Sequence, residues 1–115
     1  MTTPALSIAY FVVAAFLGAL GQYLYKSGAD IADGTIAGYL LNWRLFSGGI
    51  CYVAVMVLFV AAFRKGGALT VLYPVYASTF IWAAVIALMV YGTPIKPVNV
   101  AGMAFLVLGM FMMGK

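Results

Sequence analysis

Histidine is absent from this chain of 115 residues, and only Asp30 and Asp33 carry carboxylate side chains. Both lie outside the long apolar runs, so no acid is available within a membrane to carry protons in the usual way. The single cysteine, Cys51, cannot form an intrachain disulfide and is typical of a small packing residue. Metal-ligand clusters, nucleophile-base pairs and phosphate-binding glycine loops are also missing, which argues against an enzyme and against a metal or cofactor site.

Charge of either sign is scarce. Only 7% of the residues are charged and 67% are hydrophobic, whereas a soluble domain carries roughly 25% charged residues. Four apolar stretches of about 17–22 residues make up most of the length, and each can cross a hydrocarbon core of about 30 Å. Because the later connections are short, neighbouring helices should be antiparallel. We therefore predict an all-α integral membrane protein with one transmembrane domain over residues 1–115. The four predicted spans are approximately residues 4–25, 45–63, 68–91 and 98–113.

The longest connection, residues 29–44, is polar at its start but becomes apolar. Ile36 and Leu40 recur at helical spacing, and Trp43 and Arg44 follow. This pattern is typical of a short interfacial helix that ends at the headgroup level.

Proline and glycine predict two further structural features in the second half of the chain. Pro74 lies one to two turns inside the third span, where it removes a backbone hydrogen bond and should kink the helix. Residues 92–97 contain a glycine and two prolines and predict a tight turn between the third and fourth spans.

Basic residues are spread over the helix ends without forming a cluster, so they indicate snorkelling anchors and not a nucleic-acid site. Four spans place both termini on one side of the membrane, and each side then holds three basic residues. This balance gives no orientation by the positive-inside rule. Two interpretations stay open. In one, the balance is chance among a small number of residues, or a partner fixes the orientation; in the other, the chain inserts both ways and forms an antiparallel dimer. The two sets are Arg64, Lys65 and Lys115, and Lys26, Arg44 and Lys96.

A stripe of special residues ends the first span. Gly18, Gln22 and Lys26 are four residues apart and share one helix face, with Gly21 beside them. Glycine allows close approach of a helix or a ligand, the Gln22 amide needs partners inside a membrane, and a cation at the mouth of a groove attracts phosphate. The alternative is a helix-packing surface with a snorkelling lysine.

A second candidate group begins the third span. Tyr73 and Tyr76 face broadly the same way, and Ser78 and Thr79 follow. With a carbonyl freed by Pro74, these groups could line a polar cavity. The alternative is an aromatic belt at the membrane surface.

The fourth span carries Gly102 and Gly109, which are seven residues apart on one helix face. Small residues at that spacing permit close packing against another helix. We interpret them as a candidate dimer interface, while a contact within the same chain stays open.

Taken in order, these features resemble the small four-helix proteins of the drug/metabolite transporter superfamily. The run from Gly18 to Ala29 is similar to the signature that ends their first helix, and residues 67–74 are similar to the start of their third. Residues 92–95 and the two later glycines are similar to their last turn and fourth helix. The order and spacing hold over nearly the whole chain.

Two branches share this layout. The small multidrug resistance exporters have a glutamate eight residues before the lysine, and that position here is Gly18. Subunits of the flippase for undecaprenyl-phosphate-linked aminoarabinose have a glycine-glutamine pair and a tyrosine-proline, which Gly21-Gln22 and Tyr73-Pro74 resemble. The chain is therefore more similar to the flippase branch.

This resemblance implies a multi-pass protein of the bacterial inner membrane that translocates a lipid-linked phosphate or sugar-phosphate. Lys26 would neutralise the phosphate and Gln22 would hydrogen-bond it, while Tyr73, Tyr76 and Ser78 would contact the sugar. The partners would be membrane lipid, the lipid-linked substrate and a second subunit, identical or related, in a dimer. Two alternatives stay open: an exporter of small cations or metabolites, and a membrane accessory or assembly subunit that does not transport.

Overall fold

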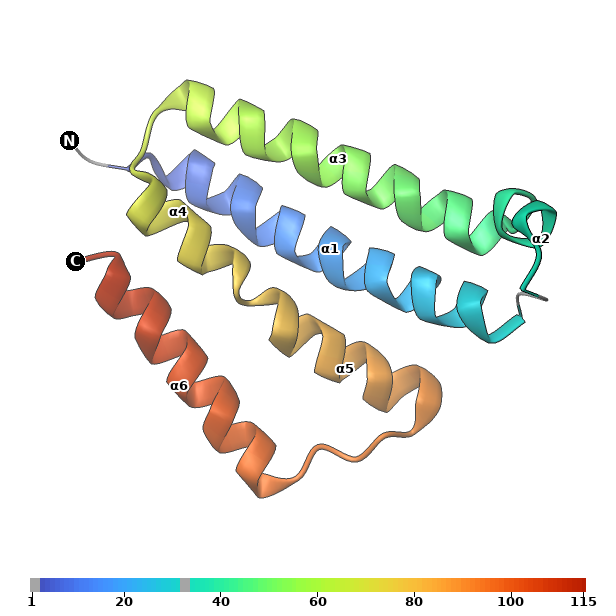
Figure 1. Ribbon diagram of the computed structural model, residues 1–115. Coiled ribbons are helices and arrows are strands. Elements are labelled where there is room, and N and C mark those ends of the chain that lie inside the picture. The colour runs from blue at the N-terminus through green and yellow to red at the C-terminus, as the bar shows by residue number, and fades with distance from the viewer. Residues whose placement is uncertain (1–2, 32–33) are drawn as a thin grey trace.

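The computed structural model describes residues 3–31 and 34–115, and it confirms the predicted all-α class (Figure 1). No strand occurs in these two ranges. The helices in chain order are α1 (Ala5–Ile31), α2 (Ile36–Leu40), α3 (Trp43–Lys65), α4 (Leu69–Tyr76), α5 (Thr79–Tyr91) and α6 (Pro97–Met113).

Helix length and composition fit a multi-pass membrane protein. Three stretches are long and apolar enough to cross a membrane: α1, α3 and the combined run Leu69–Tyr91. The fourth predicted span, α6, is a shorter apolar helix of 17 residues. The 27 residues of α1 extend over about 40 Å, which exceeds a hydrocarbon core of about 30 Å. At least one end of α1 therefore reaches headgroup depth.

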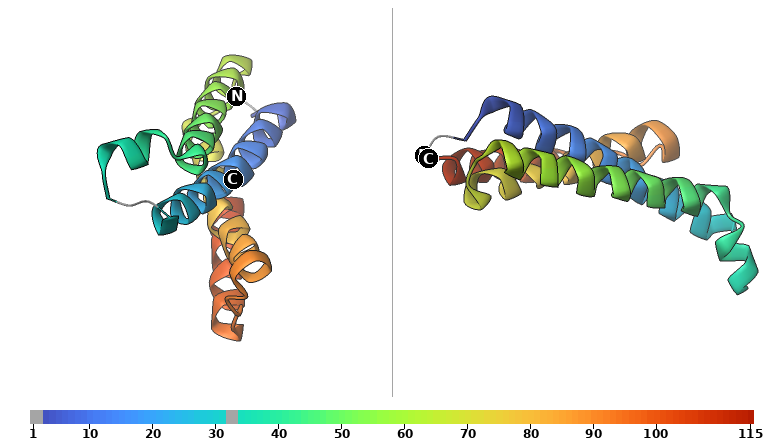
Figure 2. Two further views of the ribbon diagram at one scale, coloured as in Figure 1. Left: turned by 90° about the vertical axis from the view of Figure 1, so that its right-hand side faces the viewer. Right: turned by 90° about the horizontal axis from the view of Figure 1, so that it is seen from above.

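The helices are arranged around α1. Helix α3 lies along one side of α1, and α4 and α5 together lie along another (Figures 1 and 2). Helix α6 packs mainly against α4 and diverges from α5 (Figure 1). The fourth span is therefore the least integrated part of the fold, and its residues are largely exposed.

One end of the α1–α3 contact is fixed by Asn42. Its Nδ2 donates to the Gly28 carbonyl oxygen at 2.8 Å, while its Oδ1 accepts from the backbone N–H groups of Arg44 at 3.0 Å and Leu45 at 3.4 Å. Asn42 thus caps α3 and joins the cap to α1. Because its side chain is buried, these bonds replace those that water would supply.

The other end of the contact holds an aromatic core. Phe11 of α1 stacks on Phe59 with ring centroids 4.4 Å apart and meets Phe63 edge-on at 5.3 Å. Beside them, Ser7 is fully buried and its Oγ donates to the Ala62 carbonyl oxygen at 2.9 Å. In lipid, no hydrophobic effect drives helices together. Aromatic pairs and hydrogen-bonded polar groups are common contacts that hold them instead.

Helix α1 is longer than the predicted span, which ended near Tyr25. It continues to Ile31, and Gly28 lies inside it. The missing Cβ of Gly28 makes room for α3, because a Cβ there would lie 2.8 Å from the Leu45 Cδ2 atom. As a consequence Asp30 belongs to the last turn of α1 and not to a loop, whereas Asp33 lies outside the described residues.

The predicted short helix in the first connection is α2. Thr35 caps its start, with its Oγ1 accepting from the Gly38 backbone N–H at 2.9 Å. Trp43 and Arg44 form the first turn of α3, at the end of the molecule from which α2 projects sideways (Figure 2).

The third span is interrupted, as Pro74 predicts, but the interruption lies one turn after the proline. The backbone N–H of Ala77 bonds to the Pro74 carbonyl oxygen at 2.9 Å, and that of Ser78 bonds to Val75 at 3.1 Å. These bonds reach back three residues instead of four, so the helix tightens locally before α5 begins.

The last connection differs from the tight turn that was predicted. Gly92 ends α5 with φ at 68°, a left-handed conformation that favours glycine. Residues 92–96 then form an extended segment (Figure 1). The two prolines hold the chain extended, so α6 begins at a distance from α5.

Two adjacent glycines in α3 test the importance of close packing. A Cβ at Gly48 would lie 2.7 Å from Tyr25 ring atoms and 3.1 Å from the Gly21 carbonyl oxygen, whereas Gly49 has nothing within 4 Å. We expect Gly49→Ala to leave the melting temperature in detergent unchanged or higher, since alanine favours a helix by about 1 kcal/mol. Gly48→Ala should lower it, by the equivalent of about 1–3 kcal/mol of overpacking. Equal effects of the two substitutions would show that this contact does not hold the helices.

Candidate functional site

The residues Gln22 and Lys26 line the same cavity. It has a volume of about 260 Å³ and lies between α1 on one side and α5 and its following segment on the other. The amide and the ammonium therefore share one space, as their four-residue spacing predicts, and that space is otherwise mostly apolar and aromatic. Its remaining lining residues are Ala19, Tyr23, Ala83, Ile86, Ala87, Tyr91 and Thr93.

Lys26 has two neighbours that the sequence interpretation did not assign. Its Nζ lies 3.6 Å from the Asp30 Oδ2, one helical turn further on, and 5.1 Å from the centre of the Tyr91 ring. Both charged side chains are more than half exposed, at 61% and 56%. An exposed pair of this kind contributes only about 0–1 kcal/mol, so a competing anion can displace Asp30 at low cost.

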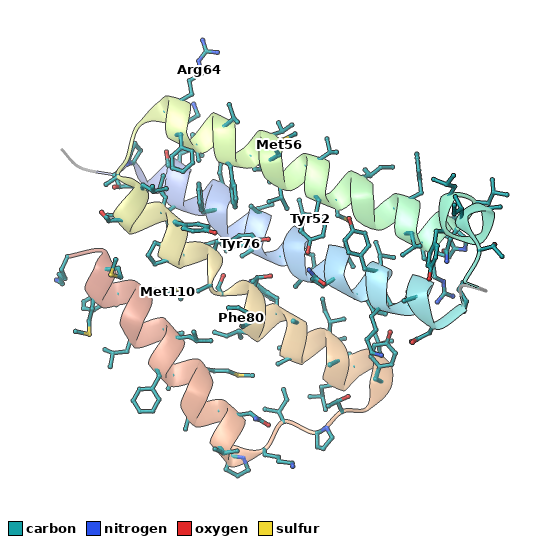
Figure 3. All side chains as sticks on the ribbon, viewed as in Figure 1. Tyr52, Met56, Arg64, Tyr76, Phe80 and Met110 are labelled. Carbon is teal, nitrogen blue, oxygen red and sulfur yellow. The ribbon has the colours of Figure 1, made fainter. Side chains whose placement is uncertain are left out.

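Gly18 is enclosed by two tyrosines. The Tyr52 hydroxyl donates to the Gly18 carbonyl oxygen at 3.3 Å, and the end of the Tyr76 ring covers the Cα, so that a Cβ would lie 3.0 Å from the Tyr76 Cζ. Figure 3 shows both tyrosines directed at α1, Tyr52 from α3 and Tyr76 from α4. The Gln22 amide lies beside the Tyr52 hydroxyl. Polar groups therefore continue from the Lys26 cavity to Gly18.

The two tyrosines grouped at the start of the third span line a cavity that is separate from that of Gln22 and Lys26. Tyr73 and Tyr76 line a cavity of about 390 Å³ at the interruption of the third span, together with Pro74, Ala77, Thr79 and Phe80.

Ser78 does not line this cavity. Its Oγ is buried and has no hydrogen-bond partner among the described residues. Ser78 is therefore not among the cavity residues with the two tyrosines that were grouped with it.

The other predicted glycines have different surroundings. A Cβ at Gly21 would lie 2.8 Å from the Tyr52 ring and 3.4 Å from the Cys51 Cβ, which makes Gly21 a contact surface for α3. Gly102 and Gly109 have nothing within 4 Å and are exposed on α6. They are open to an intermolecular contact, and the dimer interface stays a prediction.

Two residues of the site were missed from the sequence, Tyr52 and Tyr91. Each is a tyrosine in or at the end of an apolar span, and a phenol there needs a polar partner. That signal identifies the residues but not the helix they face. In the described parts of the chain, no group of three or more histidine, cysteine or acidic residues could hold a metal ion.

Comparison with protein-family models, with curated proteins and with solved structures gives no match to this chain. The roles of the site residues therefore rest on their positions and chemistry.

The contact between Gly18 and Tyr76 predicts a specific coupling. Gly18→Ala should lower the melting temperature in detergent because the new methyl group displaces the Tyr76 ring. In a Tyr76→Ala background the same substitution should be tolerated, which gives a coupling energy of about 1 kcal/mol in the double-mutant cycle. A zero coupling would mean that the ring does not occupy the space beside Gly18.

Proposed function

We propose that this protein translocates a lipid-linked phosphate or sugar-phosphate, of the polyprenyl-phosphate type, across the bacterial inner membrane. The polyprenyl tail stays in lipid while the polar head moves along α1. The proposal is supported above all by one observation: Gln22 and Lys26 share a cavity, and hydrogen-bonding groups continue from it to Gly18.

Lys26 attracts the phosphate. It lies near the end of α1, at the depth where a headgroup first meets the protein, and its present partner Asp30 is weakly held. A phosphate group offers several oxygen acceptors to an ammonium group and forms strong charge-assisted hydrogen bonds. The ligand therefore replaces Asp30 at the ammonium and leaves Asp30 facing water.

Gln22 and the tyrosines carry the headgroup further. Gln22 is placed between the Lys26 cavity and the Tyr52 hydroxyl, so its amide can pass hydrogen bonds from one to the other. Tyr76 and Tyr73 then offer phenols that bind sugar hydroxyls at the interruption of the third span. Moving a charge through hydrocarbon costs at least several kcal/mol, and this series of polar groups lowers that cost.

The cavity size suits this division of roles. A volume of about 260 Å³ is slightly below the range of about 300–1,000 Å³ for ligand pockets. It admits a phosphate and part of a sugar but not a whole lipid, so the tail remains outside.

Without an intramembrane carboxylate, movement is facilitated or driven by the gradient of the lipid itself.

The working unit that we propose is a dimer of four-helix antiparallel subunits, either identical or related. Each chain leaves the glycine face of α6 open, and a partner helix can approach the Gly102 and Gly109 backbone closely. A second subunit would also cover the side of α5 that α6 leaves exposed.

The test is flux of a fluorescent polyprenyl-phosphate sugar in liposomes that contain the purified protein. Lys26→Ala and Gln22→Ala should each abolish translocation. Lys96→Ala is the matched control, because Lys96 is an exposed lysine that does not line the cavity, and it should transport like the wild type. Translocation at the wild-type rate by both site variants would refute the assigned site.

The same assay distinguishes the alternatives. Flux that collapses with a protonophore and is competed by hydrophobic cations would indicate a small-cation exporter instead. Absence of any flux, with stable co-purification of another membrane protein, would indicate an accessory subunit.

A further inference from the structure

Large apolar side chains are exposed together at the corner between α2 and α3. The surface of a soluble protein rarely gathers so many in one place. Helix α2 projects sideways from the end of α1 and α3 (Figure 2), and its side chains adjoin those at the start of α3. We call this set the interfacial corner. Its exposed fractions are 79% for Ile36, 75% for Leu40, 84% for Leu41, 63% for Trp43 and 67% for Phe46.

The depth of the interfacial corner in the membrane follows from the residues next to it. Asn42 ties it to Gly28 in the last turns of α1, and the charged pair Lys26 and Asp30 flanks that glycine on the same helix. Charged side chains at the end of a long apolar helix mark the headgroup region. Apolar residues on a short helix at this depth insert among the upper acyl chains.

Arg44 belongs to the interfacial corner and has no anionic partner among the residues that the structure describes. Its guanidinium stacks over the Trp43 ring, with 5.3 Å from Cζ to the ring centroid, and its Nε is buried without a hydrogen-bond partner. In the parts of the chain that the structure describes, no carboxylate pairs with it. A buried donor that is left unpaired is unfavourable, so an anion that pairs with the guanidinium would stabilise this corner.

The backbone around Arg44 is held rigidly. Its N–H donates to the Asn42 Oδ1 at 3.0 Å, and Asn42 is itself bonded to α1. The base of the Arg44 side chain is therefore fixed relative to α1, and Trp43 covers one face of the guanidinium.

We propose that the interfacial corner binds the phosphate of an anionic phospholipid, with Arg44 as the phosphate ligand. The planar guanidinium matches phosphate oxygens better than an ammonium does, and the surrounding apolar residues contact the acyl chains of the same lipid. Arg44 does not line the cavity of Gln22 and Lys26, so this site is separate from the proposed pathway and does not depend on transport.

The experiment is native mass spectrometry of the full chain in detergent with added phosphatidylglycerol, and with phosphatidylcholine of the same acyl chains. We expect phosphatidylglycerol to be retained in preference. Arg44→Gln should weaken its retention about fivefold, the effect of one cationic side chain at a lipid surface.

Arg64→Gln is the matched control. Arg64 is an arginine of the same helix that points outward at the opposite end of α3 (Figure 3), and its substitution should leave retention close to that of the wild type. Equal loss in Arg44→Gln and Arg64→Gln would overturn the proposal, because it would reflect net charge alone.

Two further arms complete the test. Arg44→Lys keeps the charge and the fold but loses the planar donor set, so it should bind with intermediate strength; wild-type retention in this variant would overturn the role of the guanidinium. Inorganic phosphate at millimolar concentration should not displace the lipid, and displacement would show a site for free phosphate instead.

Discussion

Polar groups inside a lipid-embedded protein must find partners within the protein, because hydrocarbon offers none. In this chain, two glycine carbonyls of α1 supply such partners. Tyr52 donates to the oxygen of Gly18, and Asn42 donates to the oxygen of Gly28. Both bonds join α3 or its N-cap to the backbone of α1. Close packing accompanies them, because a Cβ at Gly21 or Gly28 would lie 2.8 Å from a side-chain atom of α3. The close contact of α1 and α3 is therefore the condition on which the rest of the fold depends.

That contact also decides what the remaining surface of α1 can do. With α3 packed against Gly21 and Gly28, the stripe of Gln22 and Lys26 is left beside α5 and forms a cavity with it. Gly18 stands where the two regions meet and is covered by the Tyr76 ring. A larger residue at that position would have to displace the ring, so the absence of a carboxylate there is built into the packing.

Much of the fold follows from the sequence, since helix positions, the short helix in the first connection and the interruption after Pro74 all have local causes. Which helix packs against which does not follow from the sequence. In lipid the outward helix faces are apolar as well, so hydrophobic periodicity does not distinguish a packed face from a lipid-facing one. Tyr52 and Tyr91 were missed for this reason. The ion pair of Lys26 was missed differently: Gly28 resembled a helix end, whereas it packs inside α1 and leaves Asp30 one turn from the lysine.

The central claim is that the polar stripe of α1 faces a space that water and headgroups can enter. It is tested most directly by thiol labelling in proteoliposomes, with Cys51 replaced by serine. Gln22→Cys should react roughly tenfold faster with a membrane-impermeant maleimide than Val53→Cys, because a thiol needs a wet surrounding to ionise. Val53 follows Tyr52, which packs against Gly21 beside Gln22, so it lies at a similar level along the helices. It is 56% exposed and does not line the cavity. Equally slow labelling at both positions would contradict the account.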